Sequence, residues 1–329
     1  MEGQTLSLIV IIFINNKLSF LSIESIFKLL IVSAISSILI LISILLLYLQ
    51  NKFFSFFFLV NTSLFSIYLI TLSFFFKLGI APLHIYLPEI FLGLNIITLI
   101  LISFVPKIII FIIFTNIIIC KKYFFFFIIS GLIVGSIGGL NQSNIKLVIV
   151  YSSITHASII LIGLYLNCEL SLAILFFYLI LYFITMIGVF TITLFITKKS
   201  FLIINLNNII NNKITLILSV FLLSLLGMPP LCGFISKLII INNMLKLNHD
   251  LLSIIFIITT IISSFYYIRI FQIVNDFNII NFFFWISLCN PVIIIKNIYL
   301  IFFTLFIVVS LIICPSFYIY LCYSIIFLC

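Results

Sequence analysis

The few charged residues of this chain divide it into apolar runs that are long enough to cross a membrane. Four stretches contain no charged residue at all: between Lys28 and Lys52, between Lys52 and Lys77, between Glu169 and Lys198, and from Asn297 to Cys329. A helix needs about 20 apolar residues to cross the hydrocarbon core of a bilayer, and each run exceeds that length. The sequence therefore predicts several transmembrane helices.

Composition excludes a water-soluble fold for this chain. Only 6% of its residues are charged, whereas soluble domains carry about 25%. The apolar runs are continuous and do not alternate with polar residues, which excludes a transmembrane β-barrel. We count about ten crossings and predict an all-α, polytopic integral membrane protein.

Charge and cysteine patterns argue against nucleic acid and metal as ligands. The formal charge is +9, but the basic residues occur singly or in pairs, such as Lys121-Lys122. No basic tract is available to bind a polyanion. The seven cysteines show no spacing typical of metal ligands. We therefore expect no cofactor in this chain and no nucleic-acid partner.

Glycine and proline interrupt two otherwise continuous spans. One interruption runs from Lys77 to Pro82, and the other from Gly227 to Pro230, with Lys237 shortly after it. Proline removes a helix hydrogen bond, and non-helical backbone inside a membrane is tolerated only where it is packed in protein or lines a hydrated cavity. Paired broken spans in two halves of a transporter indicate inverted repeats around a central site.

Three lysines lie inside or at the ends of long apolar spans: Lys77, Lys107 and Lys237. Removing an ammonium group from water favours its neutral form, so a buried lysine can load and release a proton near neutral pH. Ionisable groups inside membranes often belong to proton relays. Other lysines are expected at span edges, with their ammonium groups at the interface: Lys28, Lys146 and Lys213.

Two further residues have more than one interpretation from the sequence. His156 lies in mid-span after several hydroxyl residues, where it could relay protons or simply bridge two helices. Glu2 is a suitable ion partner for a buried lysine, but a glutamate at this position could equally be a solvated terminus. Both alternatives stay open on the residues alone.

Four motifs in order resemble one known family. The segment from Lys77 to Glu89 resembles its KLGxxPFHxWLPE stretch, and Val105-Pro106-Lys107 follows at the expected interval. The segment from Gly138 to His156 is similar to GGLNQxxxxKLxAYSSIxH, and that from Leu225 to Lys237 resembles SLGGLPPLxGFxxK. These motifs resemble subunit 2 of mitochondrial NADH:ubiquinone oxidoreductase (respiratory complex I), one of its antiporter-like subunits.

The resemblance implies a fold and a set of site residues. The fold has two inverted repeats of five helices, each with a discontinuous helix. We expect one transmembrane domain with residues 1–120 as the remainder of the first repeat, 121–275 as the second, and 276–329 as flanking helices. Lys77 would be the loading lysine, Lys107 the central connection and Lys237 the site toward the exit. The first eight residues resemble LELQSLSL, which makes Glu2 the carboxylate paired with Lys77.

The resemblance also implies a function and a location. The chain is expected to move protons across the mitochondrial inner membrane without redox chemistry of its own, with NADH, FMN, iron–sulfur clusters and ubiquinone bound by other subunits. Its partners would be other membrane-arm subunits and lipids. The heavy use of Phe, Ile, Asn and Lys is typical of an organelle-encoded protein. Because the sequence begins inside the helix of Glu2, a separate small chain is expected to supply the preceding helices.

Two other functions remain as alternatives. A subunit of a multi-subunit cation/proton antiporter would share the design of lysines at broken helices. A structural membrane scaffold would need no lysines at those positions, so Lys77, Lys107 and Lys237 count against it.

Overall fold

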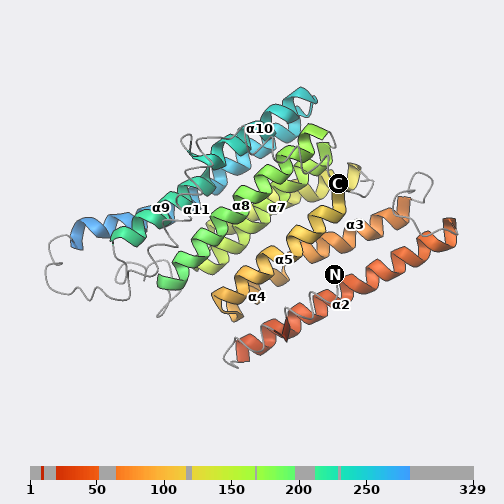
Figure 1. Ribbon diagram of the computed structural model, residues 1–329, viewed down its shortest axis with the longest axis horizontal. Helices are drawn as coiled ribbons and strands as arrows, with labels where there is room; N and C mark the ends of the chain where they lie inside the picture. Colours follow the sequence, from red (N-terminus) through yellow and green to blue (C-terminus); the bar gives the residue numbers. More distant parts are fainter. Residues whose placement is uncertain are drawn as a thin grey trace. The chain divides into compact units, whose positions relative to one another are not determined.

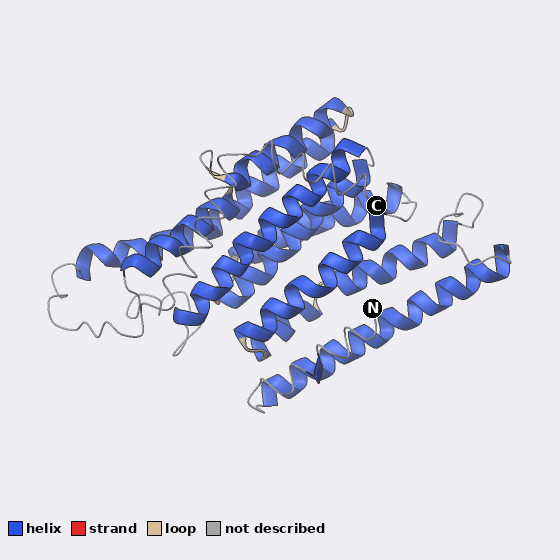
Figure 2. Cartoon of the chain, in the orientation of Figure 1, coloured by secondary structure: helices blue, strands red, loops and turns tan. Residues whose placement is uncertain are grey.

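The computed structural model describes residues 9–10, 20–51, 64–115, 121–166, 169–196, 212–228 and 231–281. Within these ranges the chain forms ten helices (Figures 1 and 2). They are α2 (Phe20–Asn51), α3 (Leu64–Leu78), α4 (Tyr86–Gly93), α5 (Ile96–Thr115), α6 (Lys121–Leu140), α7 (Ile145–Leu166), α8 (Glu169–Ile196), α9 (Asn212–Leu226), α10 (Cys232–Lys246) and α11 (Asp250–Asn281).

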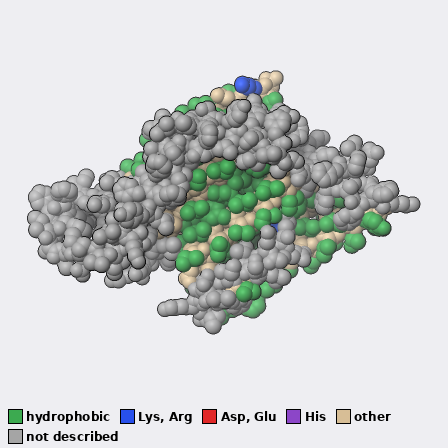
Figure 3. All heavy atoms as spheres, in the orientation of Figure 1, with side chains coloured by type: hydrophobic (Ala, Val, Ile, Leu, Met, Phe, Trp, Pro, Cys, Tyr) green, Lys and Arg blue, Asp and Glu red, His purple; other side chains and the backbone are tan. Residues whose placement is uncertain are grey.

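Six of the described helices are long and apolar enough to cross a membrane: Phe20–Leu49, Ile96–Thr115, Tyr123–Leu140, Ile145–Leu166, Ile174–Thr191 and Asp250–Gln272. Much of their surface is apolar, and hydrophobic side chains dominate the described part of the face in Figure 3. The predicted polytopic, all-α membrane protein is therefore confirmed. The count of about ten crossings also depends on residues 282–329, which lie outside the described ranges.

The remaining four helices are too short to span alone. The helices α3, α9 and α10 have 15 residues each, and α4 has 8. At 1.5 Å per residue, 15 residues cover only about 22 Å, less than the ~30 Å hydrocarbon core. They occur as two consecutive pairs, α3–α4 and α9–α10, at the two predicted interruptions. The pairs therefore lie where the sequence predicts broken spans.

The chain forms two compact units. One contains residues 1–139 and 149–167, and the other contains residues 140–148 and 168–329. Each unit holds one broken helix pair. The predicted repeats, 1–120 and 121–275, have different boundaries and stay a prediction.

In the first unit, glycines allow α6 and α7 to pack closely. A Cβ atom added to Gly135 would lie 2.9 Å from the amide nitrogen of Thr155 and 3.0 Å from the carbonyl oxygen of Tyr151. Gly138 likewise faces the ring of Tyr151. Small residues at a helix–helix contact let the two backbones approach in this way. This contact fixes the position of α7, which contributes to the site described below.

Aromatic side chains fill the interior of the same unit. Phe75 of α3 contacts three other rings, those of Phe114, Phe124 and Phe127, with centroids 4.4 to 5.6 Å apart. Such pairs add to the free energy gained from burying apolar area. They hold the end of α3, and hence the first interruption, against α5 and α6.

The second unit is built around α9, which contacts both α8 and α11. On α8, Gly188 faces Phe221 of α9, and a Cβ atom there would lie 2.6 Å from the Phe221 ring. The arginine of α11, Arg269, donates through Nη1 to the carbonyl oxygen of Leu140 at 2.9 Å. Leu140 is the last residue of α6, and a cation at a helix C-terminus stabilises its unpaired carbonyl groups.

Candidate functional site

The first interruption is a helix end built on glycine. After α3, Gly79 has a φ of +66°, a conformation that glycine adopts without steric cost. The amide of Ile80 donates to the carbonyl oxygen of Phe75 at 3.3 Å, and the amide of Gly79 donates to that of Phe76 at 3.2 Å. This pair of hydrogen bonds is the Schellman arrangement that ends many helices. The chain then turns, with the Leu83 amide donating to Ile80 at 2.8 Å.

The second interruption repeats this geometry. Gly227 follows α9 with a φ of +88°. The amide of Met228 donates to the carbonyl oxygen of Leu223 at 3.3 Å, and the amide of Leu231 donates to that of Met228 at 2.9 Å. These hydrogen bonds connect the same positions relative to the glycine as at Gly79. The glycine signal in the sequence thus predicted both helix ends correctly.

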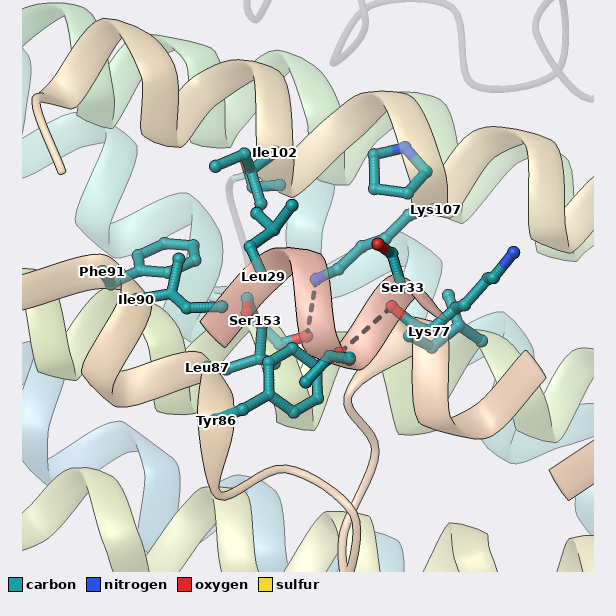
Figure 4. A pocket seen from close by; sticks show the side chains of 14 residues that line it. Leu29, Ser33, Lys77, Tyr86, Leu87, Ile90, Phe91, Ile102, Lys107 and Ser153 are labelled. Carbon is teal, nitrogen blue, oxygen red and sulfur yellow. Dashed lines mark hydrogen bonds between the residues drawn. The ribbon is translucent and has the colours of Figure 1, made fainter. Parts of the chain in front are cut away.

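A cavity of about 80 Å³ lies beside the first interruption, lined by residues of α2, α3, α4, α5 and α7. Two lysines, Lys77 and Lys107, line it together with Ser33 and Tyr86 (Figure 4). Since a site for one water molecule needs at least about 10–15 Å³ of such volume, the cavity has room for a few water molecules. Most of its wall is apolar, so water in it would bind to these polar groups and to Ser103 and Ser153, which also line it.

Lys107 is a buried cation within α5. Its exposed fraction is 5%, and its Nζ donates to the carbonyl oxygen of Ser153 on α7 at 3.3 Å. The preceding residue, Pro106, lies inside the helix and has no amide hydrogen to donate to the turn before it. The sequence prediction that Lys107 is buried is confirmed. Its hydrogen bond to Ser153 connects two helices across the cavity.

Lys77 belongs to the last turn of α3 and is half-buried. Figure 4 shows its side chain extending away from Lys107, whose Nζ points toward Ser153. The structure thus brings both lysines to one cavity, with their side chains pointing in different directions. Proton exchange between them would need water molecules or a side-chain rotation.

Tyr86, in the first turn of α4, is a residue that the sequence analysis did not single out. Its hydroxyl group lies 2.7 Å from the carbonyl oxygen of Phe76 and 3.2 Å from that of Lys77. Both carbonyl groups belong to the last turn of α3, where carbonyls lack the usual donors within the helix. That of Phe76 also accepts from the Gly79 amide. Tyr86 therefore ties the second half of the broken helix to the end of the first.

Lys237 makes the contact at the second interruption that corresponds to that of Tyr86 at the first. It is 9% exposed, and its Nζ donates to the carbonyl oxygens of Leu225 and Leu226, both at 2.9 Å. These are the last two residues of α9, at the negative end of the helix dipole. The predicted burial of Lys237 is confirmed, and its ammonium group lies across the interruption.

The other predicted residues have different outcomes. His156 is buried in α7, with 4% exposed, but it is not among the residues that line the cavity. Glu2, and the companion chain expected beside it, lie outside the described residues. Lys146 begins α7 near a span edge as predicted, yet its side chain is buried, with 8% exposed.

Lys28, predicted at a span edge, forms two ion pairs. Its Nζ lies 2.6 Å from a carboxylate oxygen of Glu24 on the same helix and 2.6 Å from one of Glu89 on α4. Nearby, Gly93 of α4 packs against the backbone of α2, because a Cβ atom at Gly93 would overlap the carbonyl oxygen of Leu21. These contacts hold together two walls of the cavity.

Of the two ion pairs of Lys28, the one with Glu89 joins two helices and the one with Glu24 lies within α2. Loss of the Glu89 carboxylate should therefore destabilise the protein more than loss of the Glu24 carboxylate. We expect Glu89→Gln to lower the midpoint temperature of unfolding of the purified protein by about one to three degrees. The matched variant Glu24→Gln, which removes an ion pair of equal length within α2, should have a smaller effect. Equal shifts for the two variants would show that the pair does not hold α4 to α2.

Comparison with known proteins identifies the family. A family model described as "NADH:quinone oxidoreductase/Mrp antiporter, TM" matches residues 1–263, which is most of the chain. The chain belongs to this family. The matched range includes both interruptions, the cavity and the five lysines described above.

Similar members of this family are known from animals and bacteria. The chain is 30% identical over 193 residues to NADH-ubiquinone oxidoreductase chain 2 of Metridium senile, covering 58% of this chain and 50% of that relative. It is 34% identical over 142 residues to NADH-quinone oxidoreductase subunit N of a Wolbachia species, covering 43% and 30%. The chain thus matches half or less of the length of these relatives.

Chains of two solved complexes share the fold. A chain of respiratory complex I from Thermus thermophilus matches with a TM-score of 0.83 and 18% identity, covering 97% of this chain and 72% of that one. A chain of the Mrp complex from Dietzia matches with a TM-score of 0.69 and 15% identity, covering 77% and 51%. At these identities the matches show that the fold is shared.

Proposed function

We propose that this chain is a proton-translocating membrane subunit of a NADH:quinone oxidoreductase, with the electron-transfer centres in other subunits. The observation that carries the proposal is the cavity shared by Lys77 and Lys107 beside the broken helix α3–α4. A cavity with two lysines and room for water is the arrangement that a proton relay inside a membrane needs. Family membership and the names of the relatives support the same assignment.

The relay has a defined order in this proposal. Displacement of charge at Glu2 shifts the proton affinity of Lys77, and water in the cavity carries the proton to Lys107. From there it continues, with His156 as a possible carrier, to Lys237. Repulsion between neighbouring protonated lysines favours release on one side of the membrane. Residues 1–120 and 121–275 would form the two inverted repeats that contain these steps.

The finer identity follows the motif resemblance. The chain would be subunit 2 of a mitochondrial enzyme, in the inner membrane, beside other membrane-arm subunits. The relatives from Metridium and from Rhizopus oryzae, named as chain 2 of NADH-ubiquinone oxidoreductase, support this version. NADH, FMN, iron–sulfur clusters and ubiquinone would bind to partner subunits.

A second function has a specific observation in its favour. The family description also covers Mrp antiporters, and the Mrp complex from Dietzia shares the fold. In that alternative the same lysines would exchange protons for another cation, without any link to NADH oxidation.

Native-gel electrophoresis of mildly solubilised membranes separates the two functions. We expect in-gel NADH staining and mass spectrometry to find this chain in the large, NADH-active band. Recovery only in a smaller band without NADH activity would favour the antiporter and contradict the proposal.

A further inference from the structure

The two broken helices have equivalent backbone hydrogen bonds but different donors at the helix end. At the first interruption the donor is the hydroxyl group of Tyr86, and at the second it is the ammonium group of Lys237. Each donor also lies close to the glycine of its interruption, Tyr86 to Gly79 and Lys237 to Gly227. A Cβ atom built on Gly79 would be 2.9 Å from the Tyr86 hydroxyl oxygen, and one built on Gly227 would be 3.3 Å from Lys237 Nζ.

The sequence positions explain why the donors differ. Phe234 follows Gly227 by the same number of residues as Tyr86 follows Gly79, but phenylalanine has no hydroxyl group. Lys237 in turn corresponds to Glu89, which has no proton to donate when ionised and instead pairs with Lys28. Among the described residues, the side-chain donor therefore stands at a different position in each interruption.

The carbonyl groups at these helix ends need a donor. The final carbonyls of a helix have no intrahelical partner, and within a membrane water is scarce, so an unsatisfied carbonyl is costly. Leu225 is buried and Leu226 is half-buried. A donor from the second half-helix meets this need and joins the two halves across the interruption.

We propose that Tyr86 and Lys237 are equivalent positioning residues that tie the two halves of their broken helices together, so that Lys237 has a second role besides proton transfer. This inference rests on the proposed function only for the proton-transfer role. The positioning role follows from the hydrogen bonds alone. A neutral hydroxyl at position 234 could then replace Lys237 in positioning but not in carrying a proton.

The test separates the two roles by moving the donor. Lys237→Met removes the donor, Phe234→Tyr supplies a hydroxyl at the position equivalent to Tyr86, and the double variant carries both changes. Hydrogen–deuterium exchange with mass spectrometry on the purified complex reports the opening of the helix end, at residues 222–228. Proton translocation per NADH oxidised is measured on the same preparations in vesicles.

We expect Lys237→Met to speed amide exchange at residues 222–228 about tenfold, because buried carbonyls lose their donor. The double variant should return to within about threefold of the parent rate while proton translocation remains absent. If Lys237→Met does not accumulate, Lys237→Arg replaces it. The arginine keeps a charged donor, so exchange should match the parent, although translocation is lost.

Three outcomes would contradict either the positioning role or the proton-transfer role of Lys237. Exchange that is unchanged in Lys237→Met would overturn the positioning role. The positioning role would also be overturned if the double variant exchanged as fast as Lys237→Met while Phe234→Tyr alone exchanged at the parent rate. Proton translocation that persists in the double variant would instead contradict the proton-transfer role and leave positioning intact.

The first interruption provides an independent check. Tyr86→Phe removes only a hydroxyl group and should speed exchange at residues 75–80 about tenfold. The matched control is Tyr123→Phe, at a half-exposed tyrosine of α6, which should leave that segment unchanged. Equal exchange in the two variants would show that the Tyr86 hydroxyl does not hold the helix end.

Discussion

Replacing Lys107 by methionine is expected to lower proton translocation at least tenfold while the subunit still accumulates. Lys107 is buried, and the hydrogen bond from its Nζ to Ser153, at 3.3 Å, is long. Methionine has a similar length and no charge to desolvate, so the cavity wall should tolerate it. A proton relay through this cavity, however, loses one of its two lysines.

The measurement is the number of protons moved per NADH oxidised in sealed vesicles, with the amount of assembled complex determined by native gel. Lys246→Met is the matched control, because Lys246 is an exposed lysine in the last turn of α10. It should pump normally. An unchanged proton yield in Lys107→Met would contradict the assignment of the cavity to the relay.

Replacing Gly135 by valine should have the largest effect on accumulation of the protein. A Cβ atom at this position would lie within 3.0 Å of backbone atoms of Thr155 and Tyr151, and backbone cannot move aside as a flexible side chain can. The helices α6 and α7 must then separate, at a cost of about 1–3 kcal/mol or more. Because α7 also carries Ser153, the contact with Lys107 would shift as well.

Thermal unfolding in detergent and the amount of assembled protein measure this change. Ile137→Val alters an exposed side chain of the same helix and serves as the control, with little expected effect. Normal accumulation and an unchanged midpoint temperature in Gly135→Val would show that the close approach of α6 and α7 is not required.

The sequence predicted best those features that have a local chemical cause. Gly79 and Gly227 mark the helix ends because their positive φ angles suit glycine, and this preference depends on the residue itself. Lys107 and Lys237 could be predicted as buried because their neighbours are apolar on both sides. In both cases the information lies within a few residues of the feature.

Features that depend on distant contacts could not be predicted in this way. Tyr86 is one of many aromatic residues in an apolar sequence, and only the folded backbone places its hydroxyl group at the end of α3. The ion pair of Lys28 with Glu89 joins segments that are far apart in the chain. Lys146 lies at a helix start, where position alone suggested exposure, but its side chain is buried.

The position of Lys28 within α2 leads us to expect the cavity near one membrane surface. From Leu29 to Leu49, α2 has no charged residue, and these residues cover roughly the thickness of the hydrocarbon core at 1.5 Å each. If this uncharged run crosses the core, we expect Lys28 and its carboxylates at headgroup level. Leu29, Val32 and Ser33, which line the cavity, follow within about 8 Å along the helix axis. With this placement, protons that enter the cavity from that surface would have a shorter path than protons from the opposite leaflet.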